Sequence, residues 1–395
     1  MWFRILFAIT TVCLWLLTFW LASHNSENSD VLSRYSSKYF GFLVAIIIVS
    51  IVSTVFQFGS AHKWIYGKRH NLTLLVLSLV FSFGCVELSI RMLDPIGISY
   101  YKHALDYHFD KIADDEMYYR HRPNLERSYQ GVSVHMNELG FRDNPIAKKE
   151  SDELRIMFLG DSVTFGWGVE QEDIFVRRVG EILEETLRRP VRTINTSVGS
   201  YNTDNQHAVM SHYGPTLDPD LVILTYVSND IEPTPVGSFN PRSQYTFSGK
   251  SPPEVIQLLA SKTWSYRLVS HIVRFREGSP STGLYKSSDG WKQSVNALQG
   301  IADYCHSRDI PFIVIMYRMV PNRLEDDIAR ELDLLSGKMS FYFGDTLTWF
   351  RGRDVRLLTN TLVDSHPNAQ GHAVLAEGMV NLITQKVFSS RDTRQ

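Results

Sequence analysis

Cysteine is scarce in this sequence of 395 residues, which contains only three. Cys13 and Cys85 lie in apolar runs, so Cys305 is the only cysteine in the more polar remainder of the chain. One thiol can build neither a disulfide framework nor a cysteine-based zinc site there. Histidines and carboxylates also lack any dense metal-ligand spacing such as His-Glu-x-x-His, so we expect neither a metal nor another cofactor.

An excess of charge of one sign is missing as well. The chain holds 40 Lys and Arg against 42 Asp and Glu, a formal net charge of −2. Proteins that bind nucleic acid need a basic surface to neutralise phosphates, so this balance argues against a nucleic-acid partner. The sequence shows no internal repeat and no low-complexity tract. Its length nevertheless exceeds that of a typical single domain and predicts at least two structural units.

Long apolar runs are confined to the first part of the chain. They occupy residues 4–22, 39–58 and 71–93. A helix needs roughly 20 residues to cross the hydrocarbon core of a bilayer, and the first two runs approach or meet that length with no charge after Arg4. Glu87 interrupts the third run, but it can pair with Arg91 four residues later on the same helix face. We therefore expect a transmembrane region over residues 1–94, retained rather than cleaved as a signal peptide, with membrane lipids as partners.

Basic residues between the runs predict how this region is oriented. Lys63, Lys68 and Arg69 crowd the second connecting loop. The positive-inside rule places that loop in the cytoplasm, so a third crossing delivers everything after Asp94 to the outer side. The sequence thus predicts a multi-pass protein of the cell membrane whose carboxy-terminal domain is extracytoplasmic. The predicted orientation reverses if the third run does not cross.

From Leu154 onward, short apolar runs alternate with helical patterns. The predicted strands are residues 154–159, 191–195, 221–227 and 311–317, and the predicted helices are 174–187, 291–306 and 369–388. This alternation predicts an α/β domain over residues 151–395, in which helices cover both faces of a parallel sheet.

Two further segments adjoin this domain. Residues 95–150 are rich in tyrosine, and we interpret them as a connector that packs on the α/β domain. Residues 231–290 form an insertion rich in proline, serine and aromatic residues. Insertions at this edge of a sheet commonly shape access to a site, but the segment could equally be a surface excursion that packs on the domain.

Four polar motifs follow the predicted strands or precede the last predicted helix. They are Gly160-Asp161-Ser162, Gly199, Ser228-Asn229-Asp230 and Asp364-Ser365-His366. Ligand sites of parallel α/β sheets lie beyond the carboxyl ends of the strands, which is where all four motifs fall. Each motif alone is weak evidence, whereas four in order indicate a single site.

The motifs contain the residue types of nucleophilic acyl chemistry. A serine hydroxyl attacks only when a base removes its proton, and a carboxylate must orient that base. We predict Ser162 as nucleophile, His366 as base and Asp364 as orienting acid. The negative oxygen formed in such a reaction needs donors, and the candidates are the N–H groups of Ser162 and Gly199 and the amide of Asn229. The plainer alternatives are a helix-capping serine, a loop histidine, and turn-forming roles for Gly199 and Asn229.

From about Leu154 to the carboxy terminus, the chain resembles the SGNH hydrolases, also called the GDSL esterase/lipase family. The segments that carry the resemblance are FLGDSVTFGWGV, NTSVGSYNT, VSND and VDSHPNAQGH. The resemblance implies a three-layer α/β/α fold and ester or acyl-transfer chemistry without a cofactor. It also implies that the residues which give the family its name are Ser162, Gly199, Asn229 and His366.

Two details extend this comparison. Many members of the family place the acid three residues before the histidine, where this chain has Val363. Asp364 stands two residues before His366, a spacing also used by some relatives that acetylate or deacetylate polysaccharides. The segment from Asn137 to Arg142, NELGFR, resembles one that is common before this domain in membrane-tethered members. The sequence alone assigns it no role.

Three functions are therefore considered. The leading one is a serine esterase that acts through an acyl-enzyme on Ser162 and removes acyl groups, acetyl first among them, from an envelope glycan or lipid. The second is an O-acyltransferase that modifies a cell-surface polysaccharide. The third, of another class, is a catalytically inactive protein that binds a glycan or a partner, and the presence of all four motif residues argues against it.

Overall fold

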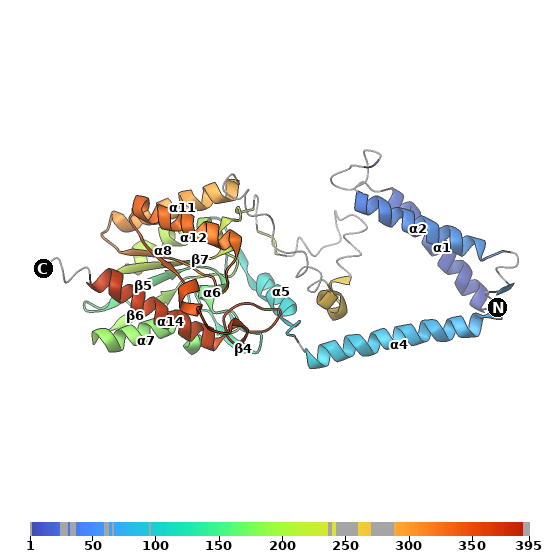
Figure 1. The fold of residues 1–395 in the computed structure, drawn as a ribbon, viewed down its shortest axis with the longest axis horizontal. Helices are drawn as coiled ribbons and strands as arrows, with labels where there is room; N and C mark the ends of the chain where they lie inside the picture. Colours follow the sequence, from blue (N-terminus) through green and yellow to red (C-terminus); the bar gives the residue numbers. More distant parts are fainter. Residues whose placement is uncertain are drawn as a thin grey trace. The chain divides into compact units, whose positions relative to one another are not determined.

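The structure is a computed structural model that describes most of the chain. The described residues are 2–23, 31, 37–58, 63–64, 67–94, 96–235, 239–241, 260–269 and 288–389. The chain divides into two compact units (Figure 1). One comprises residues 1–98 and 242–277, and the other comprises residues 99–241 and 278–395. The two units are described separately below.

In the first unit, α1 (Trp2–Ala22) packs against α2 (Ser37–Val55). Hydroxyl groups line their contact, where the Thr18 and Ser50 side-chain oxygens are 2.9 Å apart and Trp15 donates to Thr54. Such interhelical hydrogen bonds are typical of helix pairs in an apolar environment, where no water competes for the polar groups.

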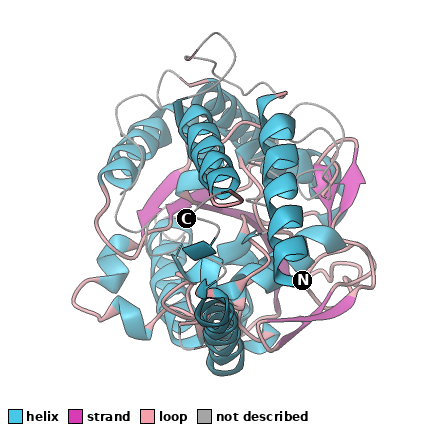
Figure 2. Ribbon diagram, turned by 90° about the vertical axis from the view of Figure 1, so that its right-hand side faces the viewer, coloured by secondary structure: helices cyan, strands magenta, loops and turns pink. Residues whose placement is uncertain are grey.

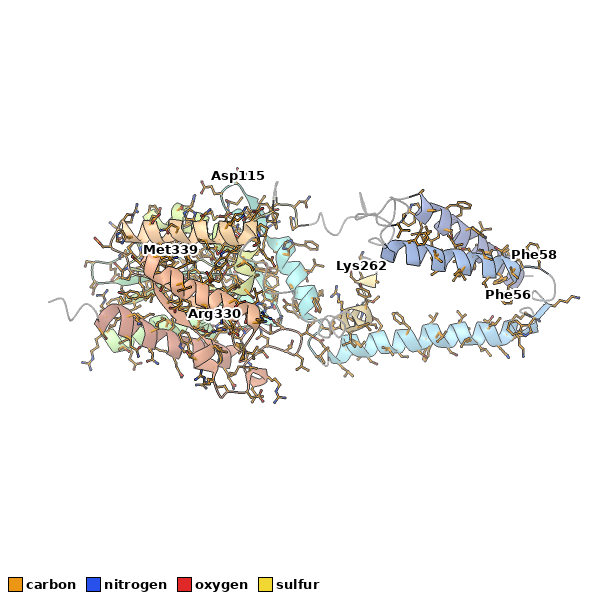
Figure 3. All side chains as sticks on the ribbon, turned by 45° about the horizontal axis from the view of Figure 1, so that its top comes forward. Phe56, Phe58, Asp115, Lys262, Arg330 and Met339 are labelled. Atoms are coloured by element: carbon orange, nitrogen blue, oxygen red, sulfur yellow. The ribbon has the colours of Figure 1, made fainter. Side chains whose placement is uncertain are left out.

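The third helix of this unit, α4 (Arg69–Leu93), is 25 residues long and has no buried residue. Its side chains project from the helix along its length (Figure 3). By length and composition, it is the one helix in the described part of the chain that could cross a membrane; two shorter apolar helices, Phe7–Ala22 and Leu43–Val55, accompany it. At about 1.5 Å per residue, α4 reaches roughly 38 Å, more than a hydrocarbon core of about 30 Å. Three crossings and the outward orientation stay predictions.

Glu87 lies within the apolar helix α4, and its negative charge is paired within the unit. Arg91 lies 2.8 Å from its carboxylate, as the four-residue spacing predicted. The same carboxylate accepts hydrogen bonds from the backbone N–H groups of Trp264 and Ser265, at the start of a short helical turn. Residues 260–269 are thereby held against α4. Most of the remaining 231–290 insertion lies outside the described residues. The prediction that it shapes access to the site therefore falls on residues that are not described.

The second unit is built on a five-stranded parallel sheet. Its strands are β5 (Leu154–Leu159), β6 (Val191–Asn195), β7 (Leu221–Tyr226), β8 (Phe312–Met316) and β9 (Tyr342–Asp345). They lie in the order β6-β5-β7-β8-β9, all parallel. The predicted α/β fold with a parallel sheet is confirmed. The strand predictions agree to within a residue at each end, except that the edge strand β9 was not predicted.

Helices cover both faces of the sheet (Figures 1 and 2). One face is covered by α8 (Thr203–Leu217), α11 (Asp289–His306) and α12 (Arg323–Met339), and the other by α7 (Phe175–Leu187) and α14 (Ala369–Ile383). The remaining short helices are α6 (Ser162–Phe165), η1 (Gln171–Asp173), η2 (Ser228–Ile231), α13 (Leu347–Phe350), η5 (Val355–Leu357) and η6 (Thr384–Phe388).

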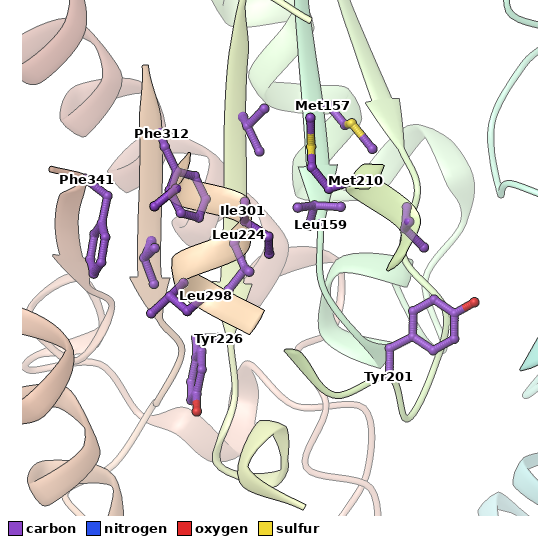
Figure 4. Close-up of a cluster of buried hydrophobic side chains, with 14 of the residues drawn as sticks. Met157, Leu159, Tyr201, Met210, Leu224, Tyr226, Leu298, Ile301, Phe312 and Phe341 are labelled. Atoms are coloured by element: carbon purple, nitrogen blue, oxygen red, sulfur yellow. The ribbon is translucent and has the colours of Figure 1, made fainter. Parts of the chain in front are cut away.

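Side-chain alternation along the strands divides the apolar residues between two cores. In β5, Met157 and Leu159 enter the core beneath α8 and α11, whereas Ile156 and Phe158 enter the core beneath α7 and α14. Figure 4 shows Met157 and Leu159 in the first core. Since successive strand residues point to opposite faces, a strand covered on both sides is apolar on both, which explains the run from Ile156 to Leu159 after Arg155.

Residues 99–150 precede the sheet in the second unit. They form α5 (Tyr100–Asp110) and two antiparallel hairpins, β1 (Ile112–Asp114) with β2 (Tyr118–Arg120) and β3 (Glu126–Tyr129) with β4 (Val132–His135). A third cluster of buried residues joins this segment to the turn after β5, and it includes Tyr107, Tyr129, Phe165 and Trp167.

Candidate active site

The strand order brings the predicted site residues to one point. β6 lies on one side of β5 and β7 on the other, so the chain changes direction across the sheet between β5 and β7. Such a switch point leaves a crevice at the carboxyl ends of the two strands. Ser162 follows β5 and Asn229 follows β7. A cavity of about 230 Å³ opens there and is lined by Asp161, Ser162, Val163, Val227, Ser228, Asn229, Tyr317, Glu325, Ser365 and His366.

A sharp turn presents Ser162 at this cavity. Ser162 begins α6, and the carboxylate of Asp161 caps that helix by accepting a hydrogen bond from Val163 N–H at 2.9 Å. A Cβ on Gly160 would lie 2.2 Å from the Thr164 hydroxyl, so no other residue fits this position without movement. The capping role is thus taken by Asp161, which leaves the Ser162 hydroxyl to other partners.

His366 bridges Ser162 and Asp364. Its Nε2 lies 2.8 Å from Ser162 Oγ, and its Nδ1 lies 2.5 Å from Asp364 Oδ1. Because an ionised carboxylate can only accept a hydrogen bond, Nδ1 carries a proton and Nε2 is free to accept one from the serine. The Ser162 hydroxyl also lies 3.1 Å from Asp161 Oδ2, a second acceptor on the same side.

Asp364 is fully buried and saturated with donors. Besides His366, its carboxylate accepts hydrogen bonds from Gln130 Nε2 at 2.7 Å and Asn360 Nδ2 at 3.1 Å. Burial alone would raise the pKa of Asp364, but the bonds and charge of His366, with Gln130 and Asn360, hold it below its ordinary value. The carboxylate therefore stays ionised beside the imidazole. In that state it orients the base and stabilises the positive charge that the base acquires.

The imidazole of His366 responds to that charge. Burial lowers the pKa of His366, but the hydrogen bond and negative charge of Asp364, aided by Asp161, outweigh burial and raise it. A raised pKa makes the imidazole a better proton acceptor.

Asn229 and Gly199, both predicted to bind an oxyanion, differ in their surroundings. Asn229 lines the cavity. The N–H of Gly199, by contrast, donates to the Tyr107 hydroxyl at 2.7 Å. Gly199 must be glycine because a Cβ there would lie 2.7 Å from the Tyr107 ring. In this structure the N–H of Gly199 is bonded to Tyr107, and the oxyanion role of Gly199 stays a prediction.

Tyr107 belongs to a chain of hydrogen bonds that leads away from the cavity. Its hydroxyl lies 2.6 Å from His121 Nε2, and His121 Nδ1 lies 3.1 Å from the Gly140 carbonyl oxygen. A carbonyl only accepts, so Nδ1 carries the proton and Tyr107 donates to Nε2. Burial lowers the pKa of His121 to about 3, which keeps that ring neutral. Sequence reasoning missed this network, although the tyrosines of residues 95–150 were its visible signal.

The segment from Asn137 to Arg142 acquires a role in the structure. The buried guanidinium of Arg142 donates to the carbonyl oxygens of Phe165, Gly166 and Val169 at 2.6–3.1 Å. These carbonyls belong to the turn that follows the candidate nucleophile. Arg142 therefore fixes the path of the chain just beyond Ser162. No pattern in the sequence alone could have indicated which distant carbonyls it would bind.

Two further ring side chains near the site pack in the interior. His372 is buried and accepts a hydrogen bond from Phe175 N–H, and burial lowers its pKa to about 3. Trp167 is buried against Tyr107 and Tyr129. In the described residues, no cluster of three or more His, Cys, Asp or Glu could hold a metal ion.

A comparison with protein families identifies the family of the second unit. Residues 158–374, more than half of the chain, match the model of the GDSL-like Lipase/Acylhydrolase family. The matched range includes the end of β5, the strands β6 to β9 and all the predicted site residues. No curated protein matches the chain.

Several solved structures are similar over the same part of the chain. The esterase EstA from Pseudoalteromonas sp. has 14% identity, covers 59% of this chain and 97% of its own, and gives a TM-score of 0.38. A catalytic mutant of the acetylxylan esterase Axe2 from Geobacillus stearothermophilus has 15% identity, covers 58% and 93%, and gives 0.38. A putative lipolytic protein of the G-D-S-L family from Desulfitobacterium hafniense has 11% identity, covers 58% and 99%, and gives 0.37.

Proposed function

Because this chain belongs to the GDSL-like lipase/acylhydrolase family, we propose that it is a serine esterase that forms an acyl-enzyme on Ser162. The observation that carries the proposal is the continuous contact from Ser162 Oγ through His366 to the buried Asp364, opening on a cavity. A preformed nucleophile, base and acid in that order are the requirements of acyl chemistry on serine. The same arrangement argues against an inactive binding protein.

In the first half of the reaction, His366 Nε2 takes the hydroxyl proton as Ser162 Oγ attacks the carbonyl carbon of the ester. The carbonyl oxygen becomes negative and is stabilised by the N–H of Ser162 and the side-chain amide of Asn229. His366 then returns the proton to the leaving alcohol oxygen, the bond to that oxygen breaks, and the acyl group stays on Ser162. Asp364 stabilises the imidazolium throughout.

In the second half, water replaces the alcohol. His366 takes a proton from water as the water oxygen attacks the acyl carbon. The proton then returns to Ser162 Oγ as the carboxylic acid leaves. We propose acetyl as the acyl group and an envelope glycan or lipid as its carrier. The apolar helix α4 supports a location at a membrane, and the basic residues before it support an extracytoplasmic domain in a multi-pass protein.

Replacing Asn229 with alanine is expected to lower turnover by about 10²–10³-fold, because an amide donor to the oxyanion is lost. Gly199 cannot compensate while its N–H is bonded to Tyr107. Steady-state kinetics on an acetyl ester would measure the loss, and circular dichroism would check that the fold is kept. Full activity in this variant would remove Asn229 from the oxyanion site.

Hydrolysis and transfer share the acyl-enzyme and differ in whether water or an acceptor hydroxyl attacks it. We expect hydrolysis to dominate. The experiment supplies the full-length protein in detergent with an acetyl ester and increasing amounts of glycan acceptor, and it quantifies acetylated acceptor against free acetate. If acetylated acceptor dominates at modest acceptor concentration, the protein is an O-acyltransferase for a cell-surface polysaccharide instead.

A further inference from the structure

One wall of the cavity carries polar groups that the proposed catalytic steps do not use. Among the residues that line the cavity, only Val163 and Val227 are apolar. A long acyl chain needs a continuous apolar surface to bury its methylene groups, and two valines cannot supply one. The groups left over after Ser162, Asn229 and His366 have been assigned include Tyr317 and Glu325, which come from neighbouring elements.

Tyr317 immediately follows β8 and presents a hydroxyl without an internal acceptor. Its oxygen is buried and has no hydrogen-bond partner among the described residues. Burial and the charges of Asp161, Glu325 and Asp364 raise the pKa of this hydroxyl, so it stays protonated. A buried donor without a partner costs free energy, and such groups in native proteins commonly await a ligand or water. Tyr317 thus brings an unpartnered donor to the lining of the cavity.

Glu325 supplies an acceptor to the same cavity. It lies in the first turn of α12, is half-buried, and contacts the Ser228 hydroxyl. Arg318, whose charge acts on Glu325, is bound by Asp326 and Asp345 instead. No ion pair of Glu325 occurs in the described part of the chain. Its carboxylate therefore retains acceptor capacity that faces the cavity.

A protonated phenol and a carboxylate in one polar cavity match a group that both accepts and donates hydrogen bonds. A sugar hydroxyl is such a group, whereas the hydrocarbon of a lipid is not. We propose that Tyr317 and Glu325 form a subsite for the hydroxyl-rich alcohol half of the ester, so that the substrate is an acylated carbohydrate. This inference rests on the esterase function proposed above and decides between the two carriers named there.

The subsite should appear as discrimination between esters with and without hydroxyl groups. The full-length protein in detergent is assayed on a monoacetylated methyl glucoside and on ethyl acetate, and kcat/KM is compared as a ratio. Glu325→Gln should lower the ratio of glucoside to ethyl acetate by roughly 10- to 100-fold, as expected for a lost bond to a charged group. Tyr317→Phe should lower it by roughly 5- to 10-fold, and both losses should lie mainly in KM.

Asp333→Asn is the matched control, because Asp333 lies exposed on the same helix and outside the cavity lining. Its ratio should equal that of the wild type.

Ser228→Ala removes the hydroxyl that contacts Glu325 but leaves the carboxylate. If Glu325→Gln and Ser228→Ala slow both esters equally, Glu325 only positions the turn at 228–231 and the subsite is wrong. An unchanged ratio in Glu325→Gln and Tyr317→Phe, or faster cleavage of p-nitrophenyl palmitate than of the glucoside, also overturns it.

A binding measurement separates the failure of the subsite from the failure of the esterase. The Ser162→Ala protein is titrated with the same acetylated glucoside, followed by isothermal calorimetry. Binding that Glu325→Gln weakens at least 10-fold in this background supports the subsite even if the wild type releases no acetate. Absence of binding, with acetate still released from ethyl acetate by the wild type, overturns the subsite and leaves the esterase standing.

Discussion

Replacing Ser162 with alanine is expected to lower turnover by about 10⁴–10⁶-fold, with the residual rate supplied by the oxyanion donors. The hydroxyl lies 2.8 Å from His366 Nε2 at the mouth of the cavity, and no other group in the proposed steps can form the acyl-enzyme. The fold should survive, because Asp161 rather than Ser162 caps α6. The variant therefore tests chemistry rather than stability.

A fluorophosphonate probe provides the direct measurement, since it reacts covalently with an activated serine. The wild type should be labelled, and Ser162→Ala should not. Ser365→Ala is the matched control, because Ser365 is an exposed serine on the same cavity, and that variant should still be labelled. Labelling that persists in the Ser162 variant would assign the nucleophile to another residue.

His366→Ala is expected to cost about as much as the loss of Ser162, again about 10⁴–10⁶-fold in turnover. The two side chains act as one unit, because the serine attacks only as the imidazole takes its proton. The double variant should consequently be no slower than either single variant. Steady-state kinetics of the three proteins measures this, and multiplicative losses would show that His366 acts independently of the nucleophile.

The pH profile gives a second readout for the same residue. His366 must be neutral to accept a proton, and Asp364 raises its pKa from an ordinary value of about 6.5. Activity should therefore be complete above the raised pKa and fall as pH drops through it. Asp364→Asn removes the raising charge, so the acid limb should move to lower pH. An acid limb at the same pH in this variant would mean that another group controls it.

The sheet was predictable from sequence where strands are buried on both faces. In β5 and β7 every residue except Arg155 and Thr225 is apolar or aromatic, because both faces are covered. The edge strand β9 (Tyr342–Asp345) has only four residues, three of them half-buried, and ends in glycine and aspartate, so it shows no such run. The helix α8 was also missed, because its buried face includes the polar residues Thr203, Asn205 and Gln206 and it contains Pro215.

The site was predictable only where neighbours in sequence determine it. Asp364 and His366 are two residues apart, and their relation to Ser162 follows from the ends of parallel strands. Gln130 and Tyr107 reach Asp364 and Gly199 across 234 and 92 residues, respectively. Such contacts depend on how residues 99–150 pack, which no local pattern encodes. The bond between Gly199 and Tyr107 was missed for this reason, as was the role of Arg142.

The hydrogen bonds from Arg142 to the turn after Ser162 bear on where the chain can be truncated. A fragment starting at residue 151 would retain the whole family-matched range but would leave the carbonyls of Phe165, Gly166 and Val169 without their donor. It would also deprive Asp364 of Gln130. We therefore expect the smallest autonomous catalytic fragment to begin near Ser99, at a border determined by these hydrogen bonds rather than by sequence similarity.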